Sequence, residues 1–135
     1  MKDEKIFEGI SRDEARMKNP VILAFIGDTV YDLYVRTSVV KNTTAGINDV
    51  HTACVSMVNA KAQSEAAAEI EGMLTEEEKE IYRRGRNAKS GVPKNMTVSD
   101  YRHATGIEAV IGYLWLTADY GRLDELFEAI INGKQ

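Results

Sequence analysis

Cysteine and proline are scarce in this chain of 135 residues. Cys54 is the single cysteine, so no disulfide can form within the chain, and we expect it to be a small buried hydrophobic residue. The two prolines, Pro20 and Pro93, lie outside the stretches with helical periodicity. Apolar residues make up 44% of the chain, which is enough for a core without covalent cross-links.

Long apolar runs are also missing. The longest one, residues 21–26, is far shorter than the roughly 20 residues that span a bilayer. Residues 1–20 contain no apolar signal-peptide core. The sequence therefore predicts a soluble, cytoplasmic protein with no membrane partner.

Helical periodicity dominates, because no stretch alternates with period two for long. Asn19 followed by Pro20 predicts the N-terminus of a helix, and Thr75 begins a capping box. We predict a compact all-α domain over residues 19–135, preceded by an N-terminal extension, residues 1–18. About six helices are predicted: 20–41; a short helix capped by Asn48; 59–71, ending at Gly72; 76–84, ending near Gly85; 100–118, capped by Ser99; and 123–131. Residues 86–98 are predicted to be a polar loop.

Negative charge predominates, with a formal net charge of −4, but the charges are segregated along the chain. Residues 65–80 contain seven glutamates and one lysine, whereas residues 81–99 contain no acidic residue. The basic residues of the second stretch are Arg83, Arg84, Arg86, Lys89 and Lys94. Such a segment is a candidate surface for a polyanion, and a solvated basic loop is the alternative.

Two acidic residues lie in apolar surroundings: Asp28 within residues 23–30 (LAFIGDTV) and Glu108 within residues 106–112 (GIEAVIG). A carboxylate in such surroundings is costly unless it is paired or binds a metal ion. The alternative is that each acid lies on the exposed stripe of an amphipathic helix. Asp32 lies one turn after Asp28, where it either extends an acidic site or is a surface residue.

Two convergent carboxylates favour a hard cation over other cofactors. No His–Cys cluster has zinc spacing, and residues 85–91 do not match the spacing of a P-loop. We expect His51 and His103 to be structural or surface residues, because neither lies in a triad-like motif. Oxygen ligands suit Mg²⁺, with Mn²⁺ as a substitute, and a basic loop nearby indicates phosphate chemistry.

Three motifs are similar to those of a known family. Residues 25–30 (FIGDTV) resemble the signature helix of ribonuclease III domains, and residues 108–112 (EAVIG) resemble the second helix motif of that family. Residues 89–91 (KSG) have a counterpart in the intervening loop. The order and spacing of these motifs agree across residues 19–131.

The departures from the family pattern indicate a branch. Many members have glutamate at the positions of Val21 and Ala24 and aspartate at the position of Thr105. Residues 83–91 (RRGRNAKSG) and 24–28 (AFIGD) resemble Mini-ribonuclease III, a compact branch without the double-stranded-RNA-binding domain. The missing acids put the number of bound metal ions in question.

The resemblance implies a homodimeric, metal-dependent endoribonuclease that cleaves double-stranded or structured RNA, leaves 5′-phosphates and matures the ends of large-subunit (23S) ribosomal RNA. It implies that Asp28 and Glu108 are catalytic and hold Mg²⁺, and no DNA substrate is expected. The residues expected to contact the RNA backbone are Arg84, Arg86, Asn87, Lys89, Ser90 and Lys94.

Two other functions remain open at this point. A non-catalytic RNA-binding or ribosome-assembly module with the same fold is one, and a helical phosphohydrolase for small nucleotides is the other. Tyr101, Arg102 and His103 either contact RNA or form a plain first helical turn. Phe25, Tyr31 and Tyr34 exceed one core-facing stripe, which predicts a dimer contact on the helix 20–41.

Overall fold

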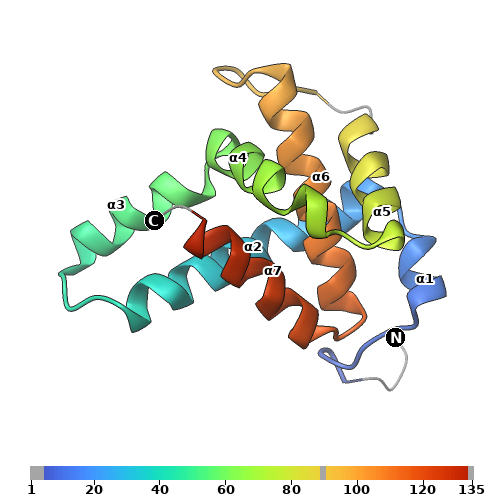
Figure 1. Cartoon of the computed structure of the whole chain (residues 1–135), viewed down its shortest axis with the longest axis horizontal. Helices are drawn as coiled ribbons and strands as arrows, with labels where there is room; N and C mark the ends of the chain where they lie inside the picture. The colour runs from blue at the N-terminus through green and yellow to red at the C-terminus, as the bar shows by residue number, and fades with distance from the viewer. Residues whose placement is uncertain (1–4, 89–90, 134–135) are drawn as a thin grey trace.

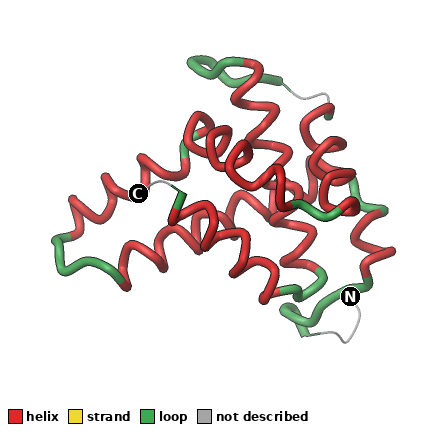
Figure 2. The backbone as a smooth tube through the Cα atoms, viewed as in Figure 1, coloured by secondary structure: helices red, strands yellow, loops and turns green. Residues whose placement is uncertain are grey.

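The computed structural model describes residues 5–88 and 91–133, and within these ranges it contains helices and loops but no strand (Figure 2). This confirms the predicted all-α fold. The elements are α1 (Arg12–Arg16), α2 (Pro20–Lys41), α3 (Ile47–Val58), α4 (Ala60–Ile70), the 3₁₀ helix η1 (Glu71–Met73), α5 (Glu76–Asn87), α6 (Val98–Leu116) and α7 (Tyr120–Asn132). None of these helices is both long and apolar enough to cross a membrane.

Local capping signals set the starts of two helices as predicted. The side chain of Asn19 accepts a hydrogen bond from the backbone N–H of Val21 at 2.8 Å, and Pro20 occupies the first turn of α2. At α5, Thr75 and Glu78 form the complete capping box, each side chain bonded to the other residue's backbone N–H.

Other boundaries differ from the prediction. Helix α3 begins at Ile47 after an extended Gly46, so Asn48 lies inside the first turn rather than at the cap. Helix α6 is capped by Thr97, whose side chain accepts from the Asp100 backbone N–H at 3.0 Å, so Ser99 is also inside its helix. Asp119 caps α7, which therefore begins three residues before the predicted start.

Gly85 does not end α5, which continues to Asn87. A Cβ at Gly85 would lie 3.0 Å from the Cβ of Ala109 and 3.0 Å from the Cα of Gly106. The residue is therefore small because α5 packs closely on α6, and this tertiary contact outweighs the tendency of glycine to end a helix.

Helix α6 forms the centre of the molecule, with α2, α4 and α5 packed around it (Figure 1). Its residues 104–107 and 109–114 are buried, and Ile107, Val110 and Ile111 are completely shielded from solvent. Cys54 is buried, as predicted. Helix α3 projects away from this centre, while the C-terminal end of α5 and the N-terminal end of α6 lie at the same end of the molecule (Figure 1).

Two glycines allow α2 and α6 to cross in backbone contact. A Cβ at Gly27 would lie 1.8 Å from the carbonyl oxygen of Glu108, and a Cβ at Gly112 would lie 1.9 Å from the carbonyl oxygen of Leu23. No side chain can be accommodated at either position without moving a helix. The crossing therefore places the backbone of Glu108 directly against the residue that precedes Asp28.

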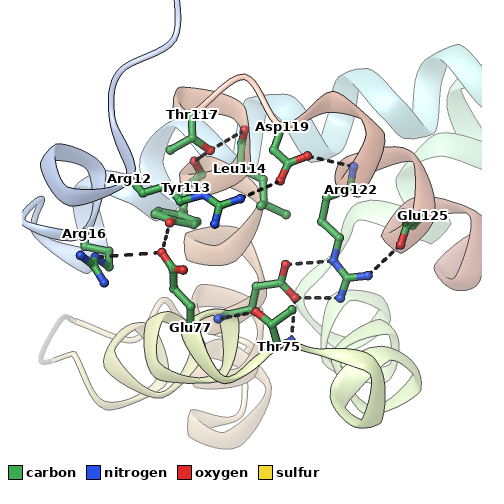
Figure 3. Close-up of polar contacts among 11 residues, drawn as sticks. Arg12, Arg16, Thr75, Glu77, Tyr113, Leu114, Thr117, Asp119, Arg122 and Glu125 are labelled. Carbon is green, nitrogen blue, oxygen red and sulfur yellow. Dashed lines mark hydrogen bonds and ion pairs between the residues drawn. The ribbon is translucent and has the colours of Figure 1, made fainter.

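A polar network joins the N-terminal part of α5 to the C-terminal part of α6 and the N-terminal part of α7 (Figure 3). Arg122 of α7 donates two hydrogen bonds to the buried carboxylate of Glu78, from Nε at 2.9 Å and from NH2 at 2.8 Å. Burial opposes the ionised form of Glu78, but the bonds from Arg122 and Thr75 lower its pKa below the usual value. Tyr113 donates to Glu77, which also lies near Arg16 (Figure 3). This network is occupied by its own partners and has a structural role.

The segment predicted to be an N-terminal extension contains α1 and contacts the helical domain. The backbone N–H of Ile10 donates to the carbonyl of Leu116 at 2.8 Å. Arg84 donates from NH1 to the carbonyl of Arg16 at 2.9 Å and from NH2 to that of Lys18 at 3.0 Å. The bonds from Arg84 attach the connection between α1 and α2 to α5, and the bond from Ile10 attaches the preceding segment to the end of α6.

Candidate active site

The α2–α6 crossing brings together the two acids that the sequence singled out. Asp28 follows Gly27 on α2, and Glu108 lies on α6 at the point of backbone contact. The two acids are close enough for Asp28 to act directly on the Glu108 carboxyl group and raise its pKa. Asp28 is exposed, whereas Glu108 is partly buried, so the pair opens to solvent on the Asp28 side.

The pKa of Glu108, the partly buried member of the pair, is strongly shifted. Burial, followed by the hydrogen bond and the charge of Asp28, raises the pKa of Glu108 to about 9, while a hydrogen bond from Gln63 lowers it. Glu108 therefore favours its protonated form more than an exposed glutamate does. Two carboxyl groups this close together form a site that a divalent cation can occupy in place of a proton.

The donor set fits a hard cation, because both candidate ligands are carboxylates. In the described ranges, histidine, cysteine, aspartate and glutamate side chains form no group of three or more arranged to hold a metal ion. Thr105 is buried and donates its hydroxyl to the carbonyl of Tyr101 at 2.8 Å. Asp32 pairs with Arg36 at 3.0 Å, as a surface ion pair. The candidate site thus consists of Asp28 and Glu108.

Two polar side chains lie near Glu108 that the sequence did not connect with it. Gln63 of α4 is only 4% exposed, and its Nε2 donates to Oε2 of Glu108 at 3.5 Å. Tyr31 of α2 is fully buried, and its hydroxyl has no hydrogen-bond partner among the described residues. Burial and, second, the charge of Glu108 raise the pKa of Tyr31 well above the usual value. Single polar residues in apolar or alanine-rich helices carry no sequence signal that separates them from surface positions.

The predicted RNA-contacting residues fall into different settings. Arg84 already donates to two backbone carbonyls, so it has a structural role that the sequence did not indicate. Arg86 and Asn87 lie in the last turn of α5 rather than in a loop, and the Arg86 guanidinium lies 5.9 Å from the centre of the Tyr82 ring. Lys94 is exposed. Lys89 and Ser90 lie outside the described residues.

A small hollow of about 410 Å³ lies where α5 ends and α6 begins, and Arg86, Asn87, Ser99, Arg102 and His103 are among its lining residues. His103 is held by a 2.6 Å hydrogen bond between its Nδ1 and the Tyr82 hydroxyl. The side chains of Arg86 and Arg102 thus face one hollow at the basic end of the molecule. Such a hollow suits a phosphate group.

A larger hollow of about 1450 Å³ lies elsewhere, between α2, α3, α4 and α7. Its lining includes Asp49, Glu65, Glu69 and Glu128, but neither member of the acid pair. Asp28 and Glu108 therefore do not line this hollow. An open, two-carboxylate surface suits a large substrate better than an enclosed pocket for a mononucleotide.

The predicted dimer contact on α2 is only partly exposed. Phe25 is 79% exposed and Ile22 is 57% exposed, three residues apart and close to Asp28 in the sequence. The expectation for Tyr31 was wrong, because it is fully buried against Phe127, with ring centres 5.2 Å apart. Tyr34 stacks on the same ring at 4.2 Å. Helix α7 covers this side of α2, which α2's own sequence does not reveal.

Comparisons with known proteins identify the family to which this chain is similar. The family model "Ribonuclease III domain" matches residues 22–119. A Mini-ribonuclease 3 of Thermoanaerobacter sp. (strain X514) is 45% identical over 122 residues, which cover 90% of this chain and 86% of the relative. A Mini-ribonuclease 3 of Clostridium tetani is 42% identical over 127 residues, covering 93% and 84% of the two chains. The crystal structure of a Fusobacterium nucleatum protein matches with a TM-score of 0.81 at 30% identity, covering 90% of this chain and 98% of that one.

Proposed function

We propose, on the premise that this chain belongs to the ribonuclease III family and to its Mini-ribonuclease 3 branch, that it hydrolyses phosphodiesters in double-stranded or structured RNA with the aid of Mg²⁺. Endoribonuclease activity follows from that membership. The observation that carries the proposal is the convergence of Asp28 and Glu108 at the crossing of α2 and α6. Members of the family generally use divalent metal ions, and Mn²⁺ is the expected substitute.

The acid pair has the chemistry that such a cation needs. Asp28 offers an exposed carboxylate. Glu108 offers a second carboxylate once its proton has been released. Asp28 and Glu108 would hold the cation through their carboxylate oxygens, which are the ligand type that Mg²⁺ prefers. When bound, a divalent cation lowers the pKa of a water molecule for attack on phosphorus and neutralises charge on the phosphoryl oxygens. The expected products carry a 5′-phosphate and a 3′-hydroxyl.

The basic end of the molecule supports the RNA part of the proposal. We infer that Arg86, Asn87 and Lys94 contact the RNA backbone, with Lys89 and Ser90 as further predicted contacts. Arg86 and Arg102 line one hollow, where guanidinium groups can bind phosphate oxygens with two parallel hydrogen bonds. Arg84 stays a predicted contact that competes with its bonds to Arg16 and Lys18. Backbone contacts of this kind recognise duplex shape rather than sequence.

A homodimer is part of the proposal. One chain offers one acid pair, so cleavage of both strands calls for two sites related by a two-fold axis. The exposed Phe25 and Ile22 on α2 provide apolar surface for that contact. Light scattering at micromolar concentration is expected to give about twice the 15.0 kDa mass of the chain, and a monomer that still cleaves both strands would contradict the dimer.

The cellular substrate is the finest part of the proposal. We infer that the enzyme matures the ends of 23S ribosomal RNA in the cytoplasm, as the resemblance to Mini-ribonuclease III implies. A ribosome-assembly module without catalysis is the alternative, and the retention of both Asp28 and Glu108 is the observation against it. Mapping of cleavage sites on precursor ribosomal RNA tests this assignment.

The test of the activity is a comparison of single-atom changes in the acid pair. Asp28→Asn is expected to abolish Mg²⁺-dependent cleavage of duplex RNA while leaving the fold and RNA binding intact, because the amide keeps the shape but not the anionic ligand. Glu108→Gln is expected to behave alike. Asp32→Asn is the matched control, since Asp32 lies one turn further along α2 and pairs with Arg36. Wild-type cleavage rates in Asp28→Asn would show that the catalytic assignment is wrong.

A further inference from the structure

The acid pair is contacted from behind by one buried side chain. Gln63 lies on α4, which packs against α6, and it is one of only three buried polar or charged residues in the described ranges. The other two are explained by other bonds: Glu78 pairs with Arg122, and Thr105 bonds to its own helix. The side-chain amide of Gln63 bonds to Glu108. Burial of an amide is costly unless the amide is hydrogen-bonded, and the bond to Glu108 offsets this cost for Gln63.

The geometry of the bond distinguishes the two oxygens of Glu108. Nε2 of Gln63 donates to Oε2 at 3.5 Å. The amide nitrogen can only donate, so the bond holds this one carboxylate oxygen from the interior. Gln63 therefore acts on Glu108 from the interior while Asp28 lies on the solvent side.

We propose that Gln63 is a positioning residue, whose side-chain amide holds Oε2 of Glu108 so that the carboxylate faces Asp28 and the cation between them. The proposal rests on the metal-dependent activity proposed above. A side chain that hydrogen-bonds to a metal ligand fixes the orientation of that ligand. Removal of such a side chain commonly weakens metal affinity by about 10–100-fold. In a site with only two protein ligands, each ligand's orientation carries a larger share of the affinity.

The test uses two variants without the donor. Gln63→Met keeps the unbranched shape, and Gln63→Leu keeps the volume, so at least one is expected to pack in the same space. Ile70→Val is the matched control, because Ile70 is buried on the same helix and the change removes packing alone. For each protein, calorimetry gives the Mg²⁺ affinity without RNA, cleavage assays give kcat and KM, and thermal unfolding confirms the fold. RNA affinity is measured on the Asp28→Asn background, where cleavage is absent.

The expected result is a weakening of Mg²⁺ affinity by roughly 10–100-fold in both Gln63 variants. We expect a higher Mg²⁺ requirement for cleavage, an unchanged KM for RNA and partial recovery of kcat at high Mg²⁺. Wild-type Mg²⁺ affinity in folded Gln63 variants, or an equal loss in Ile70→Val, would overturn the positioning role. Failure of the proposed function is distinguishable, because it would appear as absent Mg²⁺ binding or cleavage in the wild-type protein.

Discussion

Replacement of Glu108 by glutamine is expected to stabilise the metal-free protein at high pH. In the folded protein the pKa of Glu108 is raised from 4.5 to about 9, mainly by burial and then by Asp28. The folded state therefore holds a proton that the unfolded state releases in this interval. Stability from this proton is fully present below about pH 4.5 and is lost as the pH rises toward 9. Glutamine resembles the protonated form and does not titrate.

The magnitude follows from the size of the shift. Each pKa unit corresponds to about 1.4 kcal/mol, so the wild-type protein should lose about 4 kcal/mol between about pH 5 and about pH 8 from this group. Glu108→Gln should remove that loss, so the two unfolding free energies are similar near the acidic end and diverge as the pH rises. Groups that are not in contact with residue 108 contribute alike in both proteins and cancel in the comparison.

Urea unfolding followed by circular dichroism, in buffers with a chelator, measures this difference at a series of pH values. Glu65→Gln, at an exposed position of α4, controls for the removal of one negative charge. Added Mg²⁺ should flatten the wild-type profile and leave that of Glu108→Gln unchanged. Parallel profiles for wild type and Glu108→Gln over the whole range would refute the raised pKa of the partly buried Glu108.

Three further outcomes are expected. Gly27→Ala should abolish cleavage and lower the thermal unfolding temperature, because its Cβ would lie 1.8 Å from a backbone oxygen, whereas Gly121→Ala, with no atom within 4 Å, should be neutral in both assays. Arg122→Met should destabilise the fold by about 3–5 kcal/mol in urea unfolding, since it leaves a buried carboxylate without its partner; a loss under about 1 kcal/mol would contradict that role. Arg86→Ala combined with Lys89→Ala should weaken binding to all duplexes alike and reduce the log–log salt slope by about one to two units; unchanged affinity and slope would mean that another face holds the RNA.

The parts of the fold that were predictable are those with local causes. The cap at Asn19 and the capping box at Thr75 are satisfied within four residues, so their sequence signals are complete. Gly85 misled because its small size serves a contact with α6, more than 20 residues away in the sequence. The short α1 was missed because a five-residue helix depends on its contacts more than on its own propensity.

The same distinction applies to the site. Asp28 and Glu108 could be singled out because a charge among apolar neighbours is unusual wherever it lies. Gln63 could not, because it follows Lys61 and Ala62 in a helix of polar and small residues that looks solvated on every side. Its role depends on which face of α4 meets α6, and this is a property of the assembled helices. Tyr31 was misplaced for the same reason, since Phe127 of α7 covers it.

The two glycines at the α2–α6 crossing have a consequence for how this enzyme tolerates change. Gly27 and Gly112 place main chain against main chain, so the spacing of the acid pair is determined by peptide groups and not by the volumes of interchangeable side chains. Substitutions elsewhere in the core can then accumulate. They lower the fraction of folded molecules, while each folded molecule keeps the spacing between the two acids. Laboratory evolution of this scaffold should accordingly find many tolerated replacements among the core aliphatic residues and almost none at these two glycines. The spacing of the acid pair is thereby independent of the exact volumes of the core side chains.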